Sequence, residues 1–174
     1  MNSKENHRED FTVELLQENH DRASFSSGTE ILDNYLRKYA SQDVAKRVAV
    51  CFVLTPNRKT IAGFYTLSQY SVDLLELPGK IAAKLPKYPK VPTTLIGRLA
   101  IDKKFKGQGL GEFLLLDALY RSLQQSKQVA SFAVIVDAKD DVARRFYEHF
   151  DFLSLPDTPD RFFLPMKTIG KLFQ

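Results

Sequence analysis

The chain has 174 residues, a formal net charge of +4 and one cysteine. This length suits a single domain that spans the whole chain and buries one substantial core. The lone Cys51 excludes an internal disulfide and, inside an apolar run, is expected to be a buried strand residue rather than a nucleophile. His7, His20 and His149 have no metal-ligand spacing, so no metal is expected. No apolar run reaches membrane-spanning length and the polar residues 1–10 lack a signal-peptide core, so we expect a cytoplasmic protein.

The first half of the chain predicts a strand, a helix and a hairpin. Residues 12–16 are predicted as a strand, and residues 48–55 and 60–72 as a hairpin, because they are rich in aromatic and β-branched side chains. Residues 29–47 are predicted as a helix, because apolar residues recur on one face. The residues of this face are Ile31, Leu32, Tyr35, Leu36 and Tyr39.

The middle of the chain leads to a glycine-punctuated turn. Residues 77–92 are predicted as a short helix followed by a proline-rich loop, because prolines block both helix and central strand. Residues 93–101 are predicted as a strand, and Gly107, Gly109 and Gly111 separate it from a leucine-rich helix. Glycines allow close backbone approach, and the first helical turn presents unpaired N–H groups to an anion. The turn predicts a phosphate cradle, although similar turns also serve as ordinary strand-to-helix connections.

The last third of the chain adds strands and one more helix. Residues 132–136 are predicted as a buried strand, followed by a turn at 138–140 and a short helix that carries Phe146, Tyr147 and Phe150. Residues 152–155 and 161–167 are predicted as a closing pair of strands. The element order predicts an α/β (α+β) fold, with helices on the faces of a mixed sheet.

Basic residues gather in two segments. Residues 34–59 carry six basic side chains against Asp43, and residues 79–106 carry eight against Asp102. Such clustering suits a polyanionic partner, since each neutralised phosphate releases counterions. Solvated surface lysines and lysines that serve coenzyme phosphates are the alternative interpretation.

Two segments together resemble the GNAT family of acetyl-CoA-dependent N-acetyltransferases. The family's loop pattern Arg/Gln-x-x-Gly-x-Gly/Ala matches residues 106–111, with Lys106 in the first place; a lysine is compatible there because the loop binds pyrophosphate mainly through backbone N–H groups. The second pattern, Ala-x-Asn-x-x-Ala-x-x-Phe-Tyr-x-x-x-Gly-Phe, matches residues 138–152, with Asp140 replacing the asparagine and Asp151 the glycine. The resemblance implies a mixed, mostly antiparallel sheet flanked by helices. It also implies acetyl-CoA as donor, bound by Leu99, Ala100, Ile101, Lys106, Gly107, Gln108, Gly109, Leu110, Gly111 and Asp140.

The chain is most similar to one branch of this family, the GNAT toxins of type II toxin–antitoxin modules. Residues 28–55, 61–72, 95–119 and 136–152 carry this similarity. It implies acetylation of the α-amino group of the amino acid on charged tRNA, which blocks translation. It also implies a ribbon-helix-helix antitoxin as partner and a homodimer. The residues expected to bind tRNA are Lys84, Lys87, Lys90 and Arg98, where Arg98 could instead be a structural ion-pair residue.

The resemblance places the general acid at Tyr147. An α-amine has a pKa of about 8, so a usable fraction is neutral without a strong base. A phenol beside the coenzyme sulfur could protonate the leaving thiolate, but Tyr147 could also be part of an aromatic core stripe.

Two other interpretations of the function remain open. A GNAT enzyme for small-molecule or protein amines would share the coenzyme residues, and a noncatalytic acyl-CoA-binding module would not need Tyr147.

Overall fold

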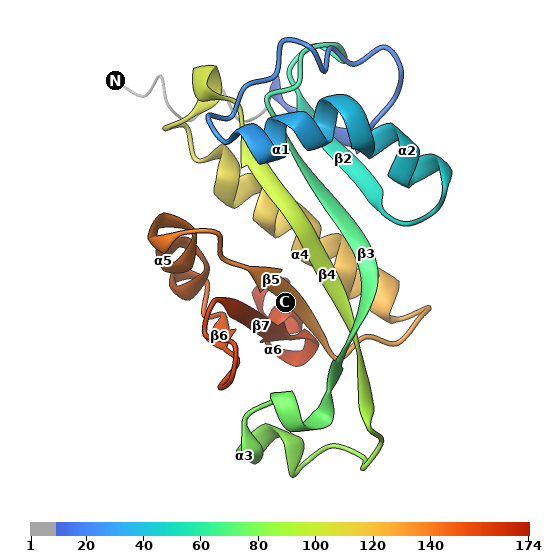
Figure 1. The fold of residues 1–174 in the computed structure, drawn as a ribbon, viewed down its shortest axis with the longest axis vertical. Helices are drawn as coiled ribbons and strands as arrows, with labels where there is room; N and C mark the ends of the chain where they lie inside the picture. Colours follow the sequence, from blue (N-terminus) through green and yellow to red (C-terminus); the bar gives the residue numbers. More distant parts are fainter. Residues whose placement is uncertain (1–9) are drawn as a thin grey trace. The chain divides into compact units, whose positions relative to one another are not determined.

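The computed structural model describes residues 10–174, so His7 and nearly all of the polar start lie outside the described residues. Among these residues, seven strands form one mixed sheet in the order β1-β2-β3-β4-β5-β7-β6. Figure 1 labels strands β2 to β7. The pair β4–β5 is parallel, whereas β1–β2, β2–β3, β5–β7 and β6–β7 are antiparallel. The predicted fold class, a mostly antiparallel mixed sheet with helices, is confirmed. None of the helices within the described residues is long and apolar enough to cross a membrane.

The helices and strands follow the chain in the order β1 (Thr12–Leu15), α1 (Glu30–Asn34), a π-helical segment (Tyr35–Tyr39), α2 (Ala40–Ala45), β2 (Val50–Thr55), β3 (Gly63–Asp73), α3 (Gly79–Ala82), β4 (Lys90–Ile101), α4 (Leu110–Ser126), β5 (Ala133–Asp137), α5 (Asp141–His149), β6 (Leu153–Ser154), β7 (Arg161–Pro165) and α6 (Met166–Leu172). Short 3₁₀ turns follow β3 and β4. The described chain divides into two compact units, residues 10–68 with 97–118 and residues 69–96 with 119–174. The single domain over the whole chain stays a prediction.

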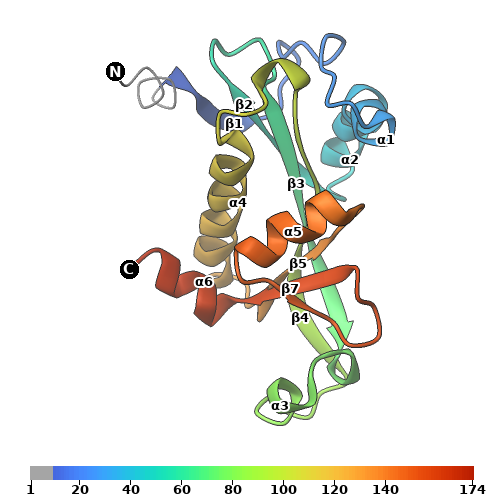
Figure 2. The ribbon, with the colours of Figure 1, turned by 90° about the vertical axis from the view of Figure 1, so that its left-hand side faces the viewer.

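In the first unit, helices cover both faces of the strands. Helices α1 and α2 lie on one side of β2 and β3, and the first half of α4 lies on the other (Figure 2). On the first side, Tyr35, Leu36 and Phe64 belong to one buried cluster. On the other side, position 63 of β3 has room only for glycine, because a Cβ there would lie 2.8 Å from the Leu114 side chain and 2.9 Å from the Ala100 carbonyl oxygen.

The predicted helix 29–47 is confirmed in place but not in all of its buried face. Ile31 is 82% exposed and Tyr39 52% exposed, whereas Leu36 and Ala40 are buried. Ile31 lies in the first turn of α1. The π-helical segment widens the turn that follows, so Ala40 takes the inward position in place of Tyr39.

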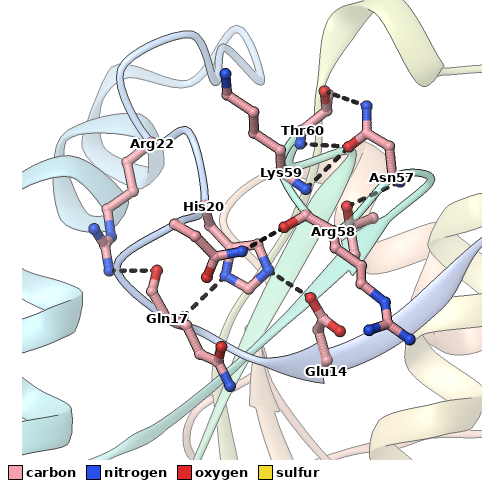
Figure 3. A network of polar contacts seen from close by, with 10 residues as sticks. Glu14, Gln17, His20, Arg22, Asn57, Arg58, Lys59 and Thr60 are labelled. Atoms are coloured by element: carbon pink, nitrogen blue, oxygen red, sulfur yellow. Dashed lines mark hydrogen bonds and ion pairs between the residues drawn. The ribbon is translucent and has the colours of Figure 1, made fainter.

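A polar network joins the loop after β1 to the tip of the β2–β3 hairpin (Figure 3). The buried His20 ring accepts a hydrogen bond at Nδ1 from the Gln17 amide (2.9 Å), and its Nε2 lies 2.7 Å from a Glu14 carboxylate oxygen. In the hairpin turn, the Asn57 side-chain oxygen accepts from the Thr60 amide (2.7 Å). Because its two ring nitrogens contact the nearby Gln17 and Glu14, His20 serves to hold this loop.

In the second unit, β5 and β7 form the centre of another core cluster. Ile135 and Phe163 lie in this cluster with Leu77 and Val91, so the segment around α3 shares the core of β5 and β7. The predicted boundary between the loop 77–92 and the strand 93–101 is wrong. Strand β4 begins at Lys90 and contains Pro92, whose carbonyl accepts from the Phe132 amide (2.8 Å). The loop therefore ends earlier than expected, because a strand proline still offers its acceptor.

The chain end differs from the prediction of a strand over 161–167. Strand β7 ends at Pro165, and α6 follows from Met166. Pro165 has φ −60° at the position before the helix, a value that proline's ring fixes and that suits a helix start. This helix has only seven residues and follows directly on a strand, so the sequence contains too few turns for a helical period to be recognised.

Candidate active site

The glycine loop (residues 106–111) follows the end of β4 through a short 3₁₀ turn. Gly107 and Gly109 have φ values of +80° and +74°, which side chains with a Cβ rarely adopt. A Cβ built on Gly107 would meet nothing within 4 Å, so there is open space at this position of the loop. The predicted turn between strand and helix is confirmed, and its glycines are needed for backbone conformation.

The loop leaves several backbone donors available. Within the described part of the chain, the amides of Gly107, Gln108 and Gly109 donate no hydrogen bond to a protein acceptor. Helix α4 begins directly after them with Leu110, whose buried side chain anchors the helix start. Amides at a helix start that have no acceptor among residues 10–174 suit an anion. These residues therefore fit the pyrophosphate of a coenzyme A derivative.

The end of β4 and the start of α4 contain the other residues expected around the coenzyme. Leu99 and Ile101 are partly buried, and Ala100 between them points into the core of the first unit. Gly111 lies in the first turn of α4. The placement of these residues on one strand and the helix that follows is compatible with the expected contacts, which stay predictions.

Tyr147 lies on α5 in the second unit and is 8% exposed. Its ring contacts those of Phe146 (5.3 Å between centroids) and Phe152 (5.4 Å), so it does belong to an aromatic cluster. Burial, helped by the nearby Asp137 carboxylate, raises the pKa of Tyr147 to about 12. The phenol therefore keeps its proton at neutral pH, as a general acid must.

Asp140 caps the helix that carries Tyr147. Its side-chain oxygen accepts a hydrogen bond from the Ala143 amide (2.8 Å), which satisfies a free donor of the first turn of α5. At the end of the same helix, Asp151 has φ +65°. Aspartate tolerates this left-handed conformation better than most residues, which explains how it can replace the motif's glycine.

Comparison with known proteins agrees with this arrangement. Residues 13–152 match the model of the acetyltransferase (GNAT) family. The chain belongs to the GNAT family of acetyltransferases. It is 41% identical over 147 residues to a tRNA-acetylating toxin of Mycobacterium tuberculosis (strain ATCC 25618 / H37Rv), covering 84% of this chain and 87% of the relative.

Solved structures of GNAT toxins are also similar. The structure of AtaT complexed with acetyl-methionyl-tRNAfMet is 28% identical with a TM-score of 0.88, covering 94% of this chain and 99% of that one. A mutant AtaT toxin bound to the C-terminus of the antitoxin AtaR and acetyl-CoA is 26% identical with a TM-score of 0.79, covering 95% of this chain and 99% of that one. The expected family and toxin branch are thus supported in sequence and in fold.

Lys106, which stands where the GNAT loop pattern has arginine or glutamine, is engaged with the protein itself. Its ammonium donates to the Ser27 carbonyl (2.8 Å). The residue before the 3₁₀ turn, Asp102, is only 4% exposed and accepts backbone hydrogen bonds from Ser26 (2.9 Å) and Lys104 (2.8 Å). Sequence analysis missed Asp102, although an aspartate directly after a strand is a recognisable cap.

Arg98 contacts an aromatic ring. Its guanidinium carbon lies 3.5 Å from the centre of the Tyr35 ring, a cation–π contact. Tyr35 is held in turn by a hydrogen bond from its hydroxyl to Asp43 (2.9 Å). Among residues 10–174, Arg98 forms no ion pair with a carboxylate. Its two alternative roles, in tRNA binding and in the structure, both stay predictions.

The three lysines expected to bind tRNA differ in their contacts. Lys90 is paired with Asp73. The Lys87 ammonium donates to the Ala82 carbonyl (3.3 Å), and Lys84 is exposed. All three are on the surface of the second unit, but Lys90 already has a carboxylate partner.

Cys51 is buried in β2, as expected. Burial raises the pKa of its thiol to about 12, so the reactive thiolate is not populated at neutral pH. Cys51 is therefore a core residue.

Proposed function

We propose that this protein is a toxin acetyltransferase that transfers the acetyl group of acetyl-CoA to the α-amino group of the amino acid on charged tRNA and so blocks translation. The observation that carries this proposal is the 41% identity to a tRNA-acetylating toxin over 84% of the chain. The open glycine loop and the protonated, buried Tyr147 supply the chemical parts that such a reaction needs.

The first unit holds the donor in this proposal. The amides of Gly107, Gln108 and Gly109 bind the pyrophosphate, with Leu110 and Gly111 at the helix start. The strand residues Leu99, Ala100 and Ile101 offer backbone groups to the pantetheine arm and the acetyl carbonyl. Asp140, in the second unit, is proposed to contact the coenzyme with the oxygen that does not cap α5.

Tyr147 acts as the general acid in this proposal. When bound, acetyl-CoA supplies an acetyl group activated as a thioester. Attack by the neutral α-amine needs no strong base, because the pKa of such an amine is about 8. The Tyr147 phenol holds a proton throughout the neutral range and gives it to the departing thiolate. The attacking amine loses one proton to solvent as the amide forms, and the phenolate takes one back, so the protons balance over a turnover.

The acceptor and the partners are proposed by analogy with the same relatives. We propose that Lys84, Lys87, Lys90 and Arg98 meet the phosphates of tRNA, where planar Arg98 can form two hydrogen bonds with one phosphate. We also propose that a ribbon-helix-helix antitoxin restrains the enzyme, that the enzyme is a homodimer and that it works in the cytoplasm.

Label transfer tests this function. The protein is incubated with acetyl-CoA labelled in the acetyl group and with bulk charged tRNA, and acid-precipitable label is counted. Label is expected on charged tRNA, and not on tRNA from which the amino acids were removed by mild alkali. Label that instead enters a protein mixture or a polyamine would identify the other kind of GNAT enzyme. Coenzyme binding without any transfer would indicate a noncatalytic module.

A further inference from the structure

A short segment before α1 is fastened to the glycine loop. The Ser26 amide donates to the Asp102 carboxylate (2.9 Å), and the Ser26 carbonyl accepts from the Lys103 amide (2.8 Å). Both backbone groups of one residue are thus held by the turn that leads into the loop. Because Asp102 is almost fully buried, loss of the hydrogen bond from the Ser26 amide would leave its carboxylate poorly satisfied.

The next residue continues this connection. The Ser27 carbonyl accepts from the Lys106 ammonium (2.8 Å), while its amide (2.8 Å) and its hydroxyl (2.6 Å) donate to Asp33 of α1. Ser27 and Asp33 are both buried. Helix α1, residues 26–27 and the start of the glycine loop therefore form one hydrogen-bonded chain, which we call the loop clip.

We propose that Lys106 and Asp102 are positioning residues, which set the glycine loop for the coenzyme by fastening it to Ser26 and Ser27. This inference rests on the proposed use of acetyl-CoA. In this proposal the Lys106 ammonium binds a backbone carbonyl of the protein, and the loop amides bind the pyrophosphate. Two glycines of the loop have positive φ, and glycine allows the free loop many alternative conformations. Hydrogen bonds that hold the residues before the loop reduce the conformational entropy that is lost when the coenzyme binds.

The competing role for Lys106 is direct contact with the pyrophosphate. The two roles differ in the ligand-free protein. A fastening residue protects amides of the loop clip before any coenzyme is present, whereas a residue that only contacts phosphate leaves them unchanged. The two roles thus predict different rates of hydrogen exchange in the free protein.

The test compares wild type, Lys106→Met and Lys106→Arg. Methionine keeps an unbranched chain without a donor, and arginine keeps a charged donor. Amide hydrogen exchange is measured without ligand in peptides covering residues 24–30 and 102–112, and coenzyme A affinity is measured by calorimetry without an acceptor. Lys106→Met is expected to exchange faster in both peptides and to bind coenzyme A about tenfold more weakly. Lys106→Arg is expected to restore both values.

Several results would overturn the proposal. Weaker coenzyme A binding with unchanged exchange would mean direct phosphate contact, and faster exchange with unchanged affinity would mean that the clip does not serve the coenzyme. An arginine variant that behaves like the methionine variant would also overturn it. Asp102→Asn, which keeps one acceptor oxygen, should change both readouts in the same direction as Lys106→Met, and wild-type values in this variant would remove Asp102 from the proposal. Failure of the wild-type protein to bind coenzyme A would instead contradict the proposed function.

Discussion

The glycine loop (residues 106–111) and the lysine segment (residues 80–90) were both expected to bind phosphates, yet they are built differently. The loop offers backbone amides that have no acceptor among residues 10–174, and its one cation, Lys106, is bound to a carbonyl. The lysine segment offers only side chains, of which Lys90 is paired with Asp73 and Lys84 is exposed.

Because they are built differently, the two regions should differ in how selectively they bind ligands. Fixed amides around an open space fit one phosphate geometry, and they cost little reorganisation when the ligand binds. Flexible lysines act as point charges and attract any polyanion, with a strong dependence on salt. We therefore expect single changes in the loop to have large effects on the coenzyme, and changes in the lysine segment to have graded effects on tRNA.

The largest effect is expected from Gly109→Glu. This change forces a side chain onto a backbone with φ +74° and places a carboxylate among the amides that we propose bind the pyrophosphate. Acetyl-CoA binding should fall below detection in titration calorimetry. Gly79→Glu is the matched control, because a Cβ there meets nothing within 4 Å and the residue lies in α3 of the second unit. Wild-type affinity in Gly109→Glu would contradict the assignment of the loop.

Tyr147→Phe should be next in size. It removes only the hydroxyl and keeps the ring contacts with Phe146 and Phe152, so thermal stability and acetyl-CoA affinity should remain close to wild type. Turnover should fall by roughly a hundredfold, the usual range for loss of a general acid. Phe146→Leu is a packing control that should lower stability more than turnover. If Tyr147→Phe acetylates charged tRNA at the wild-type rate, Tyr147 is only part of the aromatic cluster.

Changes in the lysine segment should weaken tRNA binding in graded steps. Reversing Lys84, Lys87 and Lys90 to glutamate should weaken tRNA binding by about tenfold or more at moderate salt and reduce the slope of affinity against salt, because fewer counterions are released. Acetyl-CoA affinity should not change. Lys84→Glu alone should cost more than Lys90→Glu, since Lys90 is already paired. Lys127→Glu is the charge-matched control, and tRNA binding that is equal in all variants would return the segment to ordinary solvated surface.

The smallest effect concerns pH. The reaction rate should rise with pH through about 8, as the α-amine loses its proton. The pKa of Tyr147 is raised above its ordinary value, so the acid form persists to higher pH, and the rate should not fall between about pH 8 and 10. A rate profile with a descending limb near pH 9 would assign the proton to a different group.

The parts of the site that depend on local chain conformation could be predicted from the sequence. The strand, the glycine turn and α4 are adjacent, and each is specified by its own residues, as are α5 and its cap at Asp140. The GNAT resemblance added roles that local pattern cannot supply, among them the acid role of Tyr147.

The contacts that cross long stretches of chain could not be predicted. Lys106 meets Ser27 and Arg98 meets Tyr35 only after folding, so no short-range pattern reveals them. Whether a lysine is free to bind a ligand also depends on residues far away in the chain, since the partner of Lys90 is a residue of another strand. The π-helical turn changed which side chains of the first helix are buried, because i,i+5 bonding breaks the 3.6-residue period used for prediction.

The chemical position of the transferred acetyl group tests the proposed function most directly. Charged tRNA is incubated with the protein and acetyl-CoA, digested with a ribonuclease that releases the 3′-terminal aminoacyl-adenosine, and analysed by mass spectrometry with fragmentation, with Tyr147→Phe as the control reaction. We expect the acetyl group on the α-nitrogen of the amino acid, and a much smaller yield with the variant. Acetyl groups on a nucleobase or a protein amine, with the aminoacyl-adenosine unmodified, would contradict the account.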